Sequence, residues 1–419
     1  MATTLVICLL SAISFASAEL EIVNQWSLLN YDIPYGFPTH KDYNPENTVS
    51  TGFEVGWERV FLSTPRLWPG NPATLGWFPR SKGDYSDASV VSPQLQAYPS
   101  WDWHAAAGSG NPGADNCTGL VSVFRVRADR CNRLWVLDSG VVDSLVTFET
   151  KCPPKILIFD LRNDQLVRSI TFPSEVLRLN TLFTNIVLDD LNEDAAGGYG
   201  NCDNIFAYIS DSTNPGILVY DSRNDRAWRL SHPAMFPDPD FGTYSVAGDS
   251  FTLMDGIIGL ALSPPGTSTR RLYFEAFASD RIYTIPVSAL RAGPNQGDDA
   301  DLPVSLLGTK SSQSAPLAVD NRDGSLIFSP VSETAVASWV PGSTEHGVLA
   351  YSPELLQFPL DIRSVDRDSG TIWIITTRFQ KFFKKTVSNK EINIRLMRIT
   401  KPIDDVVRSL PNNSLLLKK

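Results

Sequence analysis

The chain offers few side chains with the types and spacing of a known catalytic site. Its four histidines, His40, His104, His232 and His346, are widely separated in the sequence. No HExxH, CxxC or GxSxG pattern occurs, which argues against a zinc hydrolase and a nucleophile-elbow esterase. His104 follows a Trp-Asp-Trp run, and a hydrogen-bonded loop histidine is the favoured interpretation. No catalytic residue, metal or other cofactor is predicted from these patterns.

Carboxylates recur at the ends of apolar segments and suggest an acidic cluster. Because they stand at equivalent positions of a repeat, capping of turns is the favoured interpretation. These residues are Asp129, Asp138, Asp160, Asp190, Asp211 and Asp221.

A second group of polar residues breaks the pattern of the repeat. Asn185, Asp255, Asp361 and Glu54 open, or directly precede, the first apolar segment of a repeated unit. If these segments surround a channel, the four side chains converge at its mouth. Oxygen ligands of this kind suit calcium, but ordinary loop hydrogen bonding is favoured. Glu275 lies inside the apolar run YFEAF, where a buried carboxylate is costly unless it is paired.

The elements that must position these groups are strands. Ile156–Asp164 (ILIFDLRND) and Ile217–Asp225 (ILVYDSRND) share an Asp-x-Arg-Asn-Asp ending, typical of a strand that enters a hairpin. Another strand lies upstream of each, at Leu134–Ser139 and Phe206–Ser212. Further copies of this upstream strand are Leu272–Asp280, Leu326–Glu333 and Ile372–Arg378. No segment keeps a helical apolar period over three turns.

Four-stranded units that recur every 45–70 residues bury both of their faces when they stack in a ring. We therefore predict an all-β fold, a single six-bladed β-propeller over residues 19–419. A degenerate unit lies within Phe53–Trp103, and the strand Gln25–Asp32 is expected to complete the last sheet and close the ring with the C-terminal strands. The other five units begin near Gly119, Phe183, Gly256, Ala315 and Leu360.

Residues 1–18 have the form of a signal peptide. Leu5–Phe15 is mostly apolar but too short to span a bilayer, and Ala-Ser-Ala precedes Glu19. We expect a secreted, extracellular monomer that carries glycans at Asn116 or Asn412, where sequons occur. The net charge of −10 argues against nucleic acid and anionic membranes as partners.

Four cysteines remain after the signal peptide, which suggests two disulfides in an oxidising compartment. In an antiparallel blade, the loops alternate between the two ends of the ring. Cys117 and Cys152 precede a first and a third strand, and therefore lie at one end. Cys131 and Cys202 lie between first and second strands of neighbouring blades, at the opposite end. The predicted pairs are Cys117–Cys152 and Cys131–Cys202.

Several blocks of sequence together resemble a known family. The chain resembles the insect yellow / major royal jelly protein family across nearly all of the mature sequence, which implies a secreted six-bladed propeller. The blocks that carry the resemblance are Arg59–Arg80, Leu95–His104, Cys117–Gly140, Cys152–Leu161 and Thr377–Phe383.

The resemblance also implies a ligand site. In amine-binding relatives the ligand lies in the channel against the last blade, which by likeness marks Phe379, Thr377 and Ile362 here. A phenylalanine face can stack on a catechol or indole ring or hold an ammonium group. With Asn185 and Asp255 added from the inner-strand openings, we expect a secreted protein that binds aromatic amines or catechol-derived ligands, in cuticle pigmentation or melanisation.

Two other functions remain open. A dopachrome isomerase of the melanin pathway needs only the removal and return of a proton, for which one carboxylate with a tuned pKa suffices. Asp255 or Glu275 can serve, and nothing in the sequence singles out either. A storage role is disfavoured because the long repetitive tails of some royal jelly proteins are absent.

Overall fold

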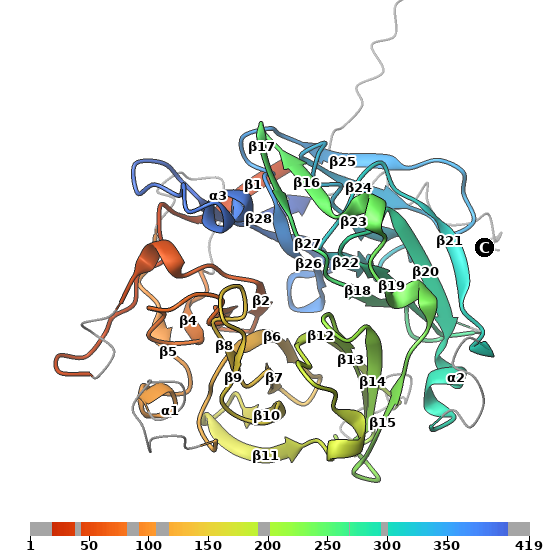
Figure 1. The fold of residues 1–419 in the computed structure, drawn as a ribbon, viewed down its shortest axis with the longest axis horizontal. Helices are drawn as coiled ribbons and strands as arrows, with labels where there is room; N and C mark the ends of the chain where they lie inside the picture. Colours follow the sequence, from red (N-terminus) through yellow and green to blue (C-terminus); the bar gives the residue numbers. More distant parts are fainter. Residues whose placement is uncertain are drawn as a thin grey trace, which may run out of the picture.

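The computed structural model describes residues 19–37, 43–81, 92–105, 117–191, 202–267, 269–294 and 301–400. Within these ranges, six four-stranded antiparallel sheets stand around a central axis (Figure 1). The innermost strands β2, β6, β12, β18, β22 and β26 contact one another in a closed cycle. The chain is thus a six-bladed β-propeller, as the repeat predicts.

The blades follow one another along the chain, each built from the axis outward. Blade 1 contains β2 (Gly52–Val55), β3 (Arg59–Ser63), β4 (Leu75–Pro79) and β5 (Gln96–Ala97). Blade 2 contains β6 (Val123–Ala128), β7 (Arg133–Asp138), β10 (Lys155–Asp160) and β11 (Gln165–Thr171). Blade 3 contains β12 (Phe183–Asp190), β13 (Ile205–Asp211), β14 (Gly216–Asp221) and β15 (Arg226–Leu230).

The second half of the ring repeats this plan. Blade 4 contains β18 (Ile257–Leu262), β19 (Arg271–Ala276), β20 (Arg281–Pro286) and β21 (Ser305–Thr309). Blade 5 contains β22 (Leu317–Val319), β23 (Leu326–Phe328), β24 (Ala335–Trp339) and β25 (Gly347–Tyr351). Blade 6 contains β26 (Pro359–Val365), β27 (Thr371–Thr376), β28 (Ile394–Thr400) and β1 (Glu19–Trp26).

The ring is closed by the two ends of the chain, since β1 pairs antiparallel with β28 along its length. The predicted closure is confirmed, but the predicted bounds Gln25–Asp32 are wrong because the closing strand ends at Trp26. After Trp26 the chain crosses to blade 1, where Asp32 and Leu95 share a backbone hydrogen bond. Both segments mix apolar and polar residues, so composition alone does not distinguish them.

The core lies mainly between neighbouring blades. Trp135 and Ile158 of blade 2 pack in one cluster with Ile186 and Ile209 of blade 3, and all four are essentially inaccessible to solvent. Burial of apolar surface stabilises such contacts by roughly 25 cal/mol per Å². Each blade therefore depends on the next one for its stability.

Several Asp residues at strand ends cap turns, as predicted. The carboxylate of Asp138 accepts hydrogen bonds from the backbone N–H groups of Val121, Ser122 and Gly140. Asp211 receives the backbone N–H of Leu182 in the same way. These carboxylates hold the entry of each inner strand against the end of the second strand.

Both predicted disulfides are present, with Cα–Cα distances of 5.5 Å for Cys117–Cys152 and 6.1 Å for Cys131–Cys202. The second bond joins the β6–β7 loop of blade 2 to the segment before β13 of blade 3 and therefore links two blades.

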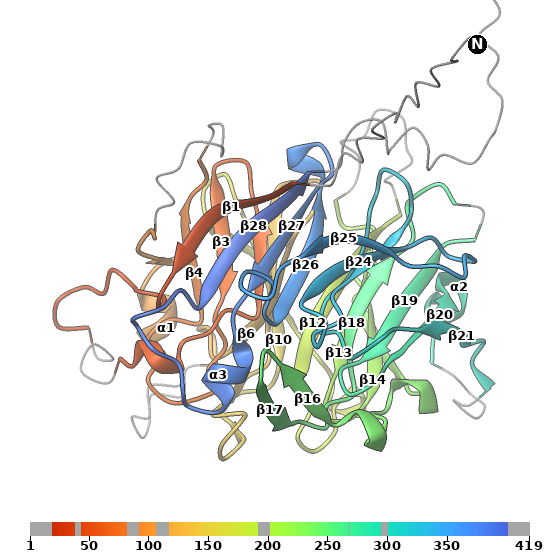
Figure 2. The same ribbon diagram turned by 90° about the horizontal axis from the view of Figure 1, so that it is seen from above.

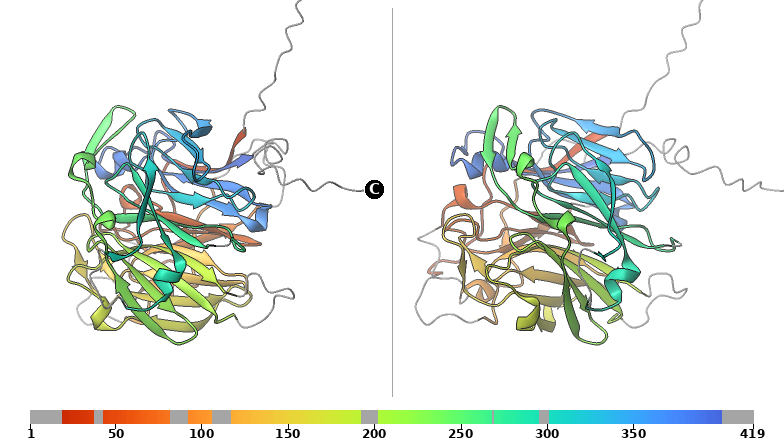
Figure 3. Two further views of the ribbon diagram at one scale, coloured as in Figure 1. Left: turned by 90° about the vertical axis from the view of Figure 1, so that its right-hand side faces the viewer. Right: turned by 45° about the vertical axis from the view of Figure 1, so that its right-hand side comes forward.

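Short elements outside the blades gather at one end of the ring. Figures 2 and 3 show the hairpin of β16 (Thr243–Val246) and β17 (Asp249–Thr252) at the same end as helix α3 (Phe379–Phe383). The remaining short elements are β8 (Val141–Val142), β9 (Glu149–Thr150), α1 (Asp102–Ala105) and α2 (Val287–Arg291). Among the described helices, none has the length and apolar character required to cross a membrane.

Some predictions concern residues outside the described ranges. The signal peptide at residues 1–18, His40 and both sequon residues, Asn116 and Asn412, lie there. Secretion and glycosylation therefore stay predictions.

Candidate functional site

One irregularity recurs in four of the six inner strands. The register shifts near the start of β6, β12, β18 and β26, so that one residue in each strand has no partner on the neighbouring strand. A β-bulge of this kind re-aims the extra side chain. The extra residues are Phe124, Thr184, Ile258 and Leu360. All four line one cavity, which lies at the end of the channel where the inner strands begin.

This cavity, here called the aromatic cavity, has a volume of about 70 Å³. Its lining is mostly apolar and includes the rings of Phe124, Phe277 and Phe379 together with the carboxyl group of Asp255. Phe379 is the first residue of α3, and Arg378 before it has a positive φ of 43° that turns the chain from β27 into the helix. The turn brings the Phe379 ring over the channel.

Asp255 brings a titratable group into these apolar surroundings. It directly precedes β18, and its backbone carbonyl accepts a hydrogen bond from the N–H of Ala278. Burial raises the pKa of Asp255 from 3.8 to about 6, because desolvation disfavours the charged form. A cationic ligand in the same cavity would favour the ionised form of Asp255 and lower its pKa again.

Aromatic side chains cover this end of the channel. The Tyr244 and Phe251 rings of the β16–β17 hairpin stack with their centroids 5.1 Å apart. The Phe251 ring also lies 5.9 Å from that of Phe379 and 4.6 Å from that of Phe383. The hairpin and α3 thus form an apolar cover, and entry to the aromatic cavity from this end passes between them.

A polar layer crosses the channel below the aromatic cavity. We call Arg125, Arg127, Asn185 and Asp361 the arginine belt. One oxygen of Asp361 lies 2.9 Å from Arg125 Nη1 and 3.3 Å from Arg127 Nη1. Arg127 Nη2 donates to Asn185 Oδ1 at 3.1 Å, and Asn185 Nδ2 donates to the carbonyl of Ile258 at 2.8 Å. The belt joins blades 2, 3, 4 and 6.

Of the four polar inner-strand residues expected to converge, only Asn185 and Asp361 meet in the belt. The expectation is wrong for Asp255 and Glu54, which line the aromatic and the wide cavity respectively. Burial opposes ionisation of Asp361, but Arg125 and Arg127 hold the pKa of its carboxyl below 3.8. Guanidinium groups therefore supply the positive charge beside Asp361. Nowhere in the described ranges do three His, Cys, Asp or Glu side chains gather in a way that would hold a metal ion.

A second cavity, here called the wide cavity, occupies the opposite end of the channel and measures about 510 Å³. Its lining comes from the last residues of the inner strands, whereas the lining of the aromatic cavity comes from their first residues. The two cavities therefore lie at opposite ends of the channel. Its charged lining residues are Glu54, Arg127, Asp129, Arg130, Asp190, Arg270, Arg363, Asp366 and Arg367.

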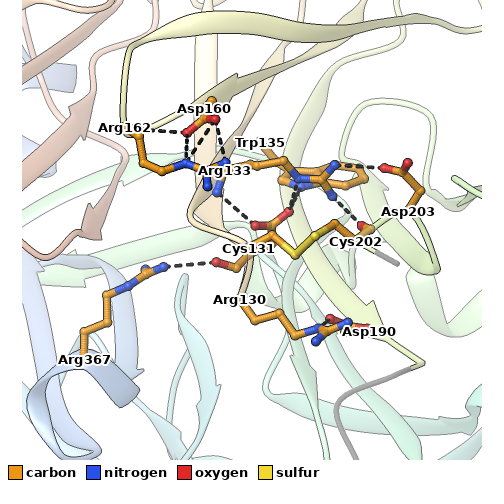
Figure 4. The surroundings of a disulfide bond; sticks show 11 residues. Arg130, Cys131, Arg133, Trp135, Asp160, Arg162, Asp190, Cys202, Asp203 and Arg367 are labelled. Carbon is orange, nitrogen blue, oxygen red and sulfur yellow. Dashed lines mark hydrogen bonds and ion pairs between the residues drawn. A yellow bond between two sulfur atoms is a disulfide. The ribbon is translucent and has the colours of Figure 1, made fainter. Parts of the chain in front are cut away.

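The disulfide Cys131–Cys202 lies next to this lining. Figure 4 shows Arg130 paired with Asp190 beside the bond, and Arg367 approaching from blade 6. The Arg367 guanidinium donates to the backbone carbonyl of Asp129 at 3.0 Å. The disulfide thus holds the loop that carries Arg130 and that presents the Asp129 carbonyl to Arg367.

The five predicted ligand-binding residues do not meet in one place. Phe379 and Asp255 line the aromatic cavity, Asn185 belongs to the arginine belt, and Ile362 lines the wide cavity. Thr377 is fully buried and lines neither cavity, since its hydroxyl and its N–H both point to the carbonyl of Phe358.

The bulge in β26 is the reason for the position of Ile362. It directs Leu360 toward the aromatic cavity and sets Ile362 beyond the belt. Phe124, Phe277 and the cover residues Tyr244 and Phe251 were not identified from the sequence. The longest interval of the repeat, 73 residues between Asp190 and Ser263, was the available signal, because the hairpin is inserted there.

Glu275, the alternative candidate for a catalytic carboxylate, forms a buried ion pair with Lys310. Its side chain is fully buried, and its Oε2 lies 2.7 Å from the Nζ of the equally buried Lys310. Burial raises its pKa, and Lys310 opposes that rise. Glu275 is absent from the lining of both cavities, which leaves Asp255 as the carboxyl group that faces the aromatic cavity.

His104 is a hydrogen-bonded buried histidine, as interpreted from the sequence. Its Nδ1 accepts the backbone N–H of Thr74 at 3.3 Å, and its Nε2 lies 3.0 Å from the carbonyl of Tyr98. Burial lowers its pKa to about 3, so the ring is neutral at physiological pH.

Comparisons with known proteins agree on one family. The profile described as Major royal jelly protein matches residues 121–408. Dopaminechrome tautomerase of Drosophila melanogaster is 28% identical over 422 residues, which cover 96% of this chain and 86% of that protein. Protein yellow of Drosophila yakuba is 30% identical over 416 residues, which cover 96% of this chain and 73% of that protein.

Proposed function

The chain belongs to the major royal jelly protein family, and from that premise we propose that it binds aromatic amines or catechol-derived cations in the aromatic cavity. The observation that carries this proposal is the placement of Asp255 and Phe379 in the lining of one apolar cavity. A ring face attracts a cation, and a carboxylate in poorly hydrated surroundings pairs strongly with an ammonium group.

The size of the cavity requires a movement of its cover. At about 70 Å³ it is smaller than typical small-molecule sites of roughly 300–1,000 Å³. The β16–β17 hairpin meets α3 through ring contacts and through the exposed pair Lys384–Asp249. Its base is held more firmly, because Tyr244 packs on Phe277 and Phe358 and the Thr243 carbonyl accepts a hydrogen bond from Gln313. We propose that the hairpin opens to admit the ligand and closes over it.

Calorimetry on the purified protein tests the binding proposal. Dopamine and serotonin are expected to bind, whereas 4-ethylcatechol, which lacks the ammonium group, should bind at least about tenfold more weakly. Asp255→Asn should remove most of the preference for dopamine over 4-ethylcatechol. Phe379→Ala should weaken the binding of dopamine by about 1 kcal/mol or more. Asp240→Asn, at an exposed aspartate, is the matched control. Equal affinity for dopamine and 4-ethylcatechol would contradict the role of Asp255.

A second candidate function is tautomerisation of an aminochrome. Two observations favour it: the pKa of Asp255 is raised to about 6, and a relative of similar length is named Dopaminechrome tautomerase. A carboxylate removes a proton from a carbon of the five-membered ring, the C–H electron pair shifts into the conjugated system, and one quinone oxygen takes up a proton. A second shift of the same kind, from the neighbouring carbon to the other quinone oxygen, completes the aromatic dihydroxyindole isomer. The step consumes no oxidant or cofactor, and a base with a pKa near neutrality suits it.

The decay of dopaminechrome absorbance tests this second function. The purified protein should accelerate decay above a heat-denatured sample, and Asp255→Asn should lower the rate at least about a hundredfold. Asp240→Asn should leave the rate unchanged. Amine binding without acceleration would exclude the tautomerase, and full activity of Asp255→Asn would exclude Asp255 as the base.

We further propose that the protein is secreted and acts in pigmentation. Two disulfides suit an oxidising compartment, and several relatives are named Protein yellow. Expression of the full chain in insect cells should release a product whose first residue is Glu19. Retention of residues 1–18 on the released protein would contradict the proposed cleavage.

A further inference from the structure

The wide cavity is large enough to be a ligand site in its own right. Its volume of about 510 Å³ falls within the usual range for small-molecule sites. The arginine belt separates it from the aromatic cavity, so the two cavities present independent surfaces. Its chemistry is also different. Its lining carries five arginines, whereas the aromatic cavity is lined mainly by apolar and aromatic side chains, with Asp255 and Arg125 as its charged residues.

Positive charge is in excess on the floor of the wide cavity. Arg363 Nη1 lies 3.0 Å from Glu54 Oε2, and Arg367 Nη1 lies 3.9 Å from the other oxygen of Glu54. Arg125 and Arg127 share the single carboxylate of Asp361. Arg125 lines the aromatic cavity, whereas Arg127, Arg363 and Arg367 line the wide cavity. On this floor, three guanidinium groups therefore meet the carboxylates of Glu54 and Asp361, and Asp361 is shared with Arg125, in a chain whose net charge is −10.

The other carboxylates of the lining are already engaged. Asp129 pairs with Arg133 at 2.7 Å, and Asp190 pairs with Arg130. Asp366 accepts a hydrogen bond from Asn321. Five arginines and four carboxylates line the cavity, and Arg270 pairs with Asp189 outside the lining at 3.1 Å. The uneven charge therefore lies where Arg363 and Arg367 share Glu54. Burying cations without equal counter-charge is unfavourable, and burial lowers the pKa of Arg127 to about 9, with Arg363 adding to this effect.

An aromatic ring stands at the mouth of the same cavity. Trp57 lines it and is 60% exposed, which is unusual for so large a side chain. The Arg367 guanidinium lies 5.7 Å from the centre of the Trp57 ring. An exposed ring beside a guanidinium offers a stacking face and a charge partner to one ligand.

We propose that the wide cavity binds a small aromatic carboxylate, whose ring packs on Trp57 and whose anionic group pairs with Arg363 and Arg367. The carboxylate supplies the counter-charge that the floor lacks. This site is distinct in position and charge preference from the cation site proposed at Asp255, so either can exist without the other.

Calorimetry with indole-3-acetate as the probe tests the proposal on the full chain. Indole-3-acetate is expected to bind at least about tenfold more tightly than the neutral indole-3-acetamide, because only the anion satisfies the arginines. Arg363→Gln should weaken indole-3-acetate about tenfold. Trp57→Ala, at an exposed position that folding tolerates, should weaken it several-fold.

Two control variants locate the binding. Arg162→Gln removes an arginine whose side chain is 71% exposed and lies outside the cavity, and should leave the affinity for indole-3-acetate unchanged. Phe379→Ala alters the aromatic cavity and should also leave it unchanged. Absence of binding, equal affinity for acid and amide, or weakening by Phe379→Ala but not by Trp57→Ala would overturn the proposal.

Discussion

One carboxylate oxygen of Asp361, on the inner strand of blade 6, lies 2.9 Å from the guanidinium of Arg125 on the inner strand of blade 2. Both side chains are almost completely buried, and the contact bridges the channel past the intervening blade 1. It divides the channel into two cavities of different character. The end above it is aromatic and carries Asp255, and the end below it is wide and rich in arginine.

Removal of the Asp361 charge should destabilise the protein. Asp361→Asn leaves Arg125 and Arg127 buried without their counter-ion, which should cost about 3–5 kcal/mol in the free energy of unfolding. Asp160→Asn breaks the exposed pair with Arg162 and should cost less than about 1 kcal/mol. Urea unfolding of both variants measures the difference, and equal losses would contradict the importance of the belt.

The pH dependence of stability should report on Asp255. Its pKa is about 6 in the folded protein and 3.8 as the ordinary value, so between these values the folded state binds more protons than the unfolded state. The free energy of unfolding therefore falls as the pH rises from about 4 to about 6. Above that range the full cost of burying the ionised Asp255 carboxylate is present. Asp255→Asn removes this cost.

Urea unfolding at two pH values checks this expectation. At about pH 7.5, Asp255→Asn should be more stable than the wild type by about 3 kcal/mol, and at about pH 3 the difference should nearly vanish. Asp240→Asn should change neither value. A gain that is independent of pH would show that Asp255 does not titrate as expected.

A methyl group at Gly259 should disrupt the buried pair of Glu275 and Lys310. A Cβ at this position would lie 2.5 Å from Glu275 Cγ, and the carboxylate would have to move away from Lys310. We expect Gly259→Ala to destabilise the protein by about 2–4 kcal/mol in thermal or urea unfolding. Gly347→Ala is the control, because the atom nearest to its new Cβ is the Oγ of the flexible Ser338 side chain. This variant should lose less than about 1 kcal/mol in the free energy of unfolding.

The aromatic cover should control how fast a ligand enters. Phe251→Ala removes the ring that contacts both Phe379 and Phe383, so stopped-flow fluorescence should show faster association and faster dissociation of dopamine. Phe236→Ala, at a ring that is 51% exposed, is the matched control. Unchanged rates for Phe251→Ala would show that the hairpin does not act as a cover.

Local sequence patterns predict much of the architecture. The shared endings of Ile156–Asp164 and Ile217–Asp225 reveal the repeat, and its period predicts six blades. Because loops of antiparallel blades alternate between the two ends, the order of strands also predicts which cysteines pair. Both disulfides confirm that reasoning. The closing strand was misplaced because Glu19–Trp26 and the segment after it have a similar mixture of apolar and polar residues.

The site was less accessible to sequence reasoning. Phe379 and Asp255 were identified and line the same cavity, but Ile362 and Thr377 were grouped with them and lie elsewhere. The grouping rested on likeness to amine-binding relatives, which does not reveal the bulge at Leu360. A bulge is defined by the pairing of two strands, so neither strand alone reveals it.

The sequence by itself determined the all-β class, the number of blades, the pairing of the cysteines and the presence of Asp255 beside an inner strand, because each depends on local patterns repeated along the chain. Only the tertiary structure decided that Arg125 and Asp361 meet across the channel, that hairpin and helix cover one end, and that arginines gather at the other. These contacts join residues hundreds of positions apart, and their geometry follows from strand register and blade packing.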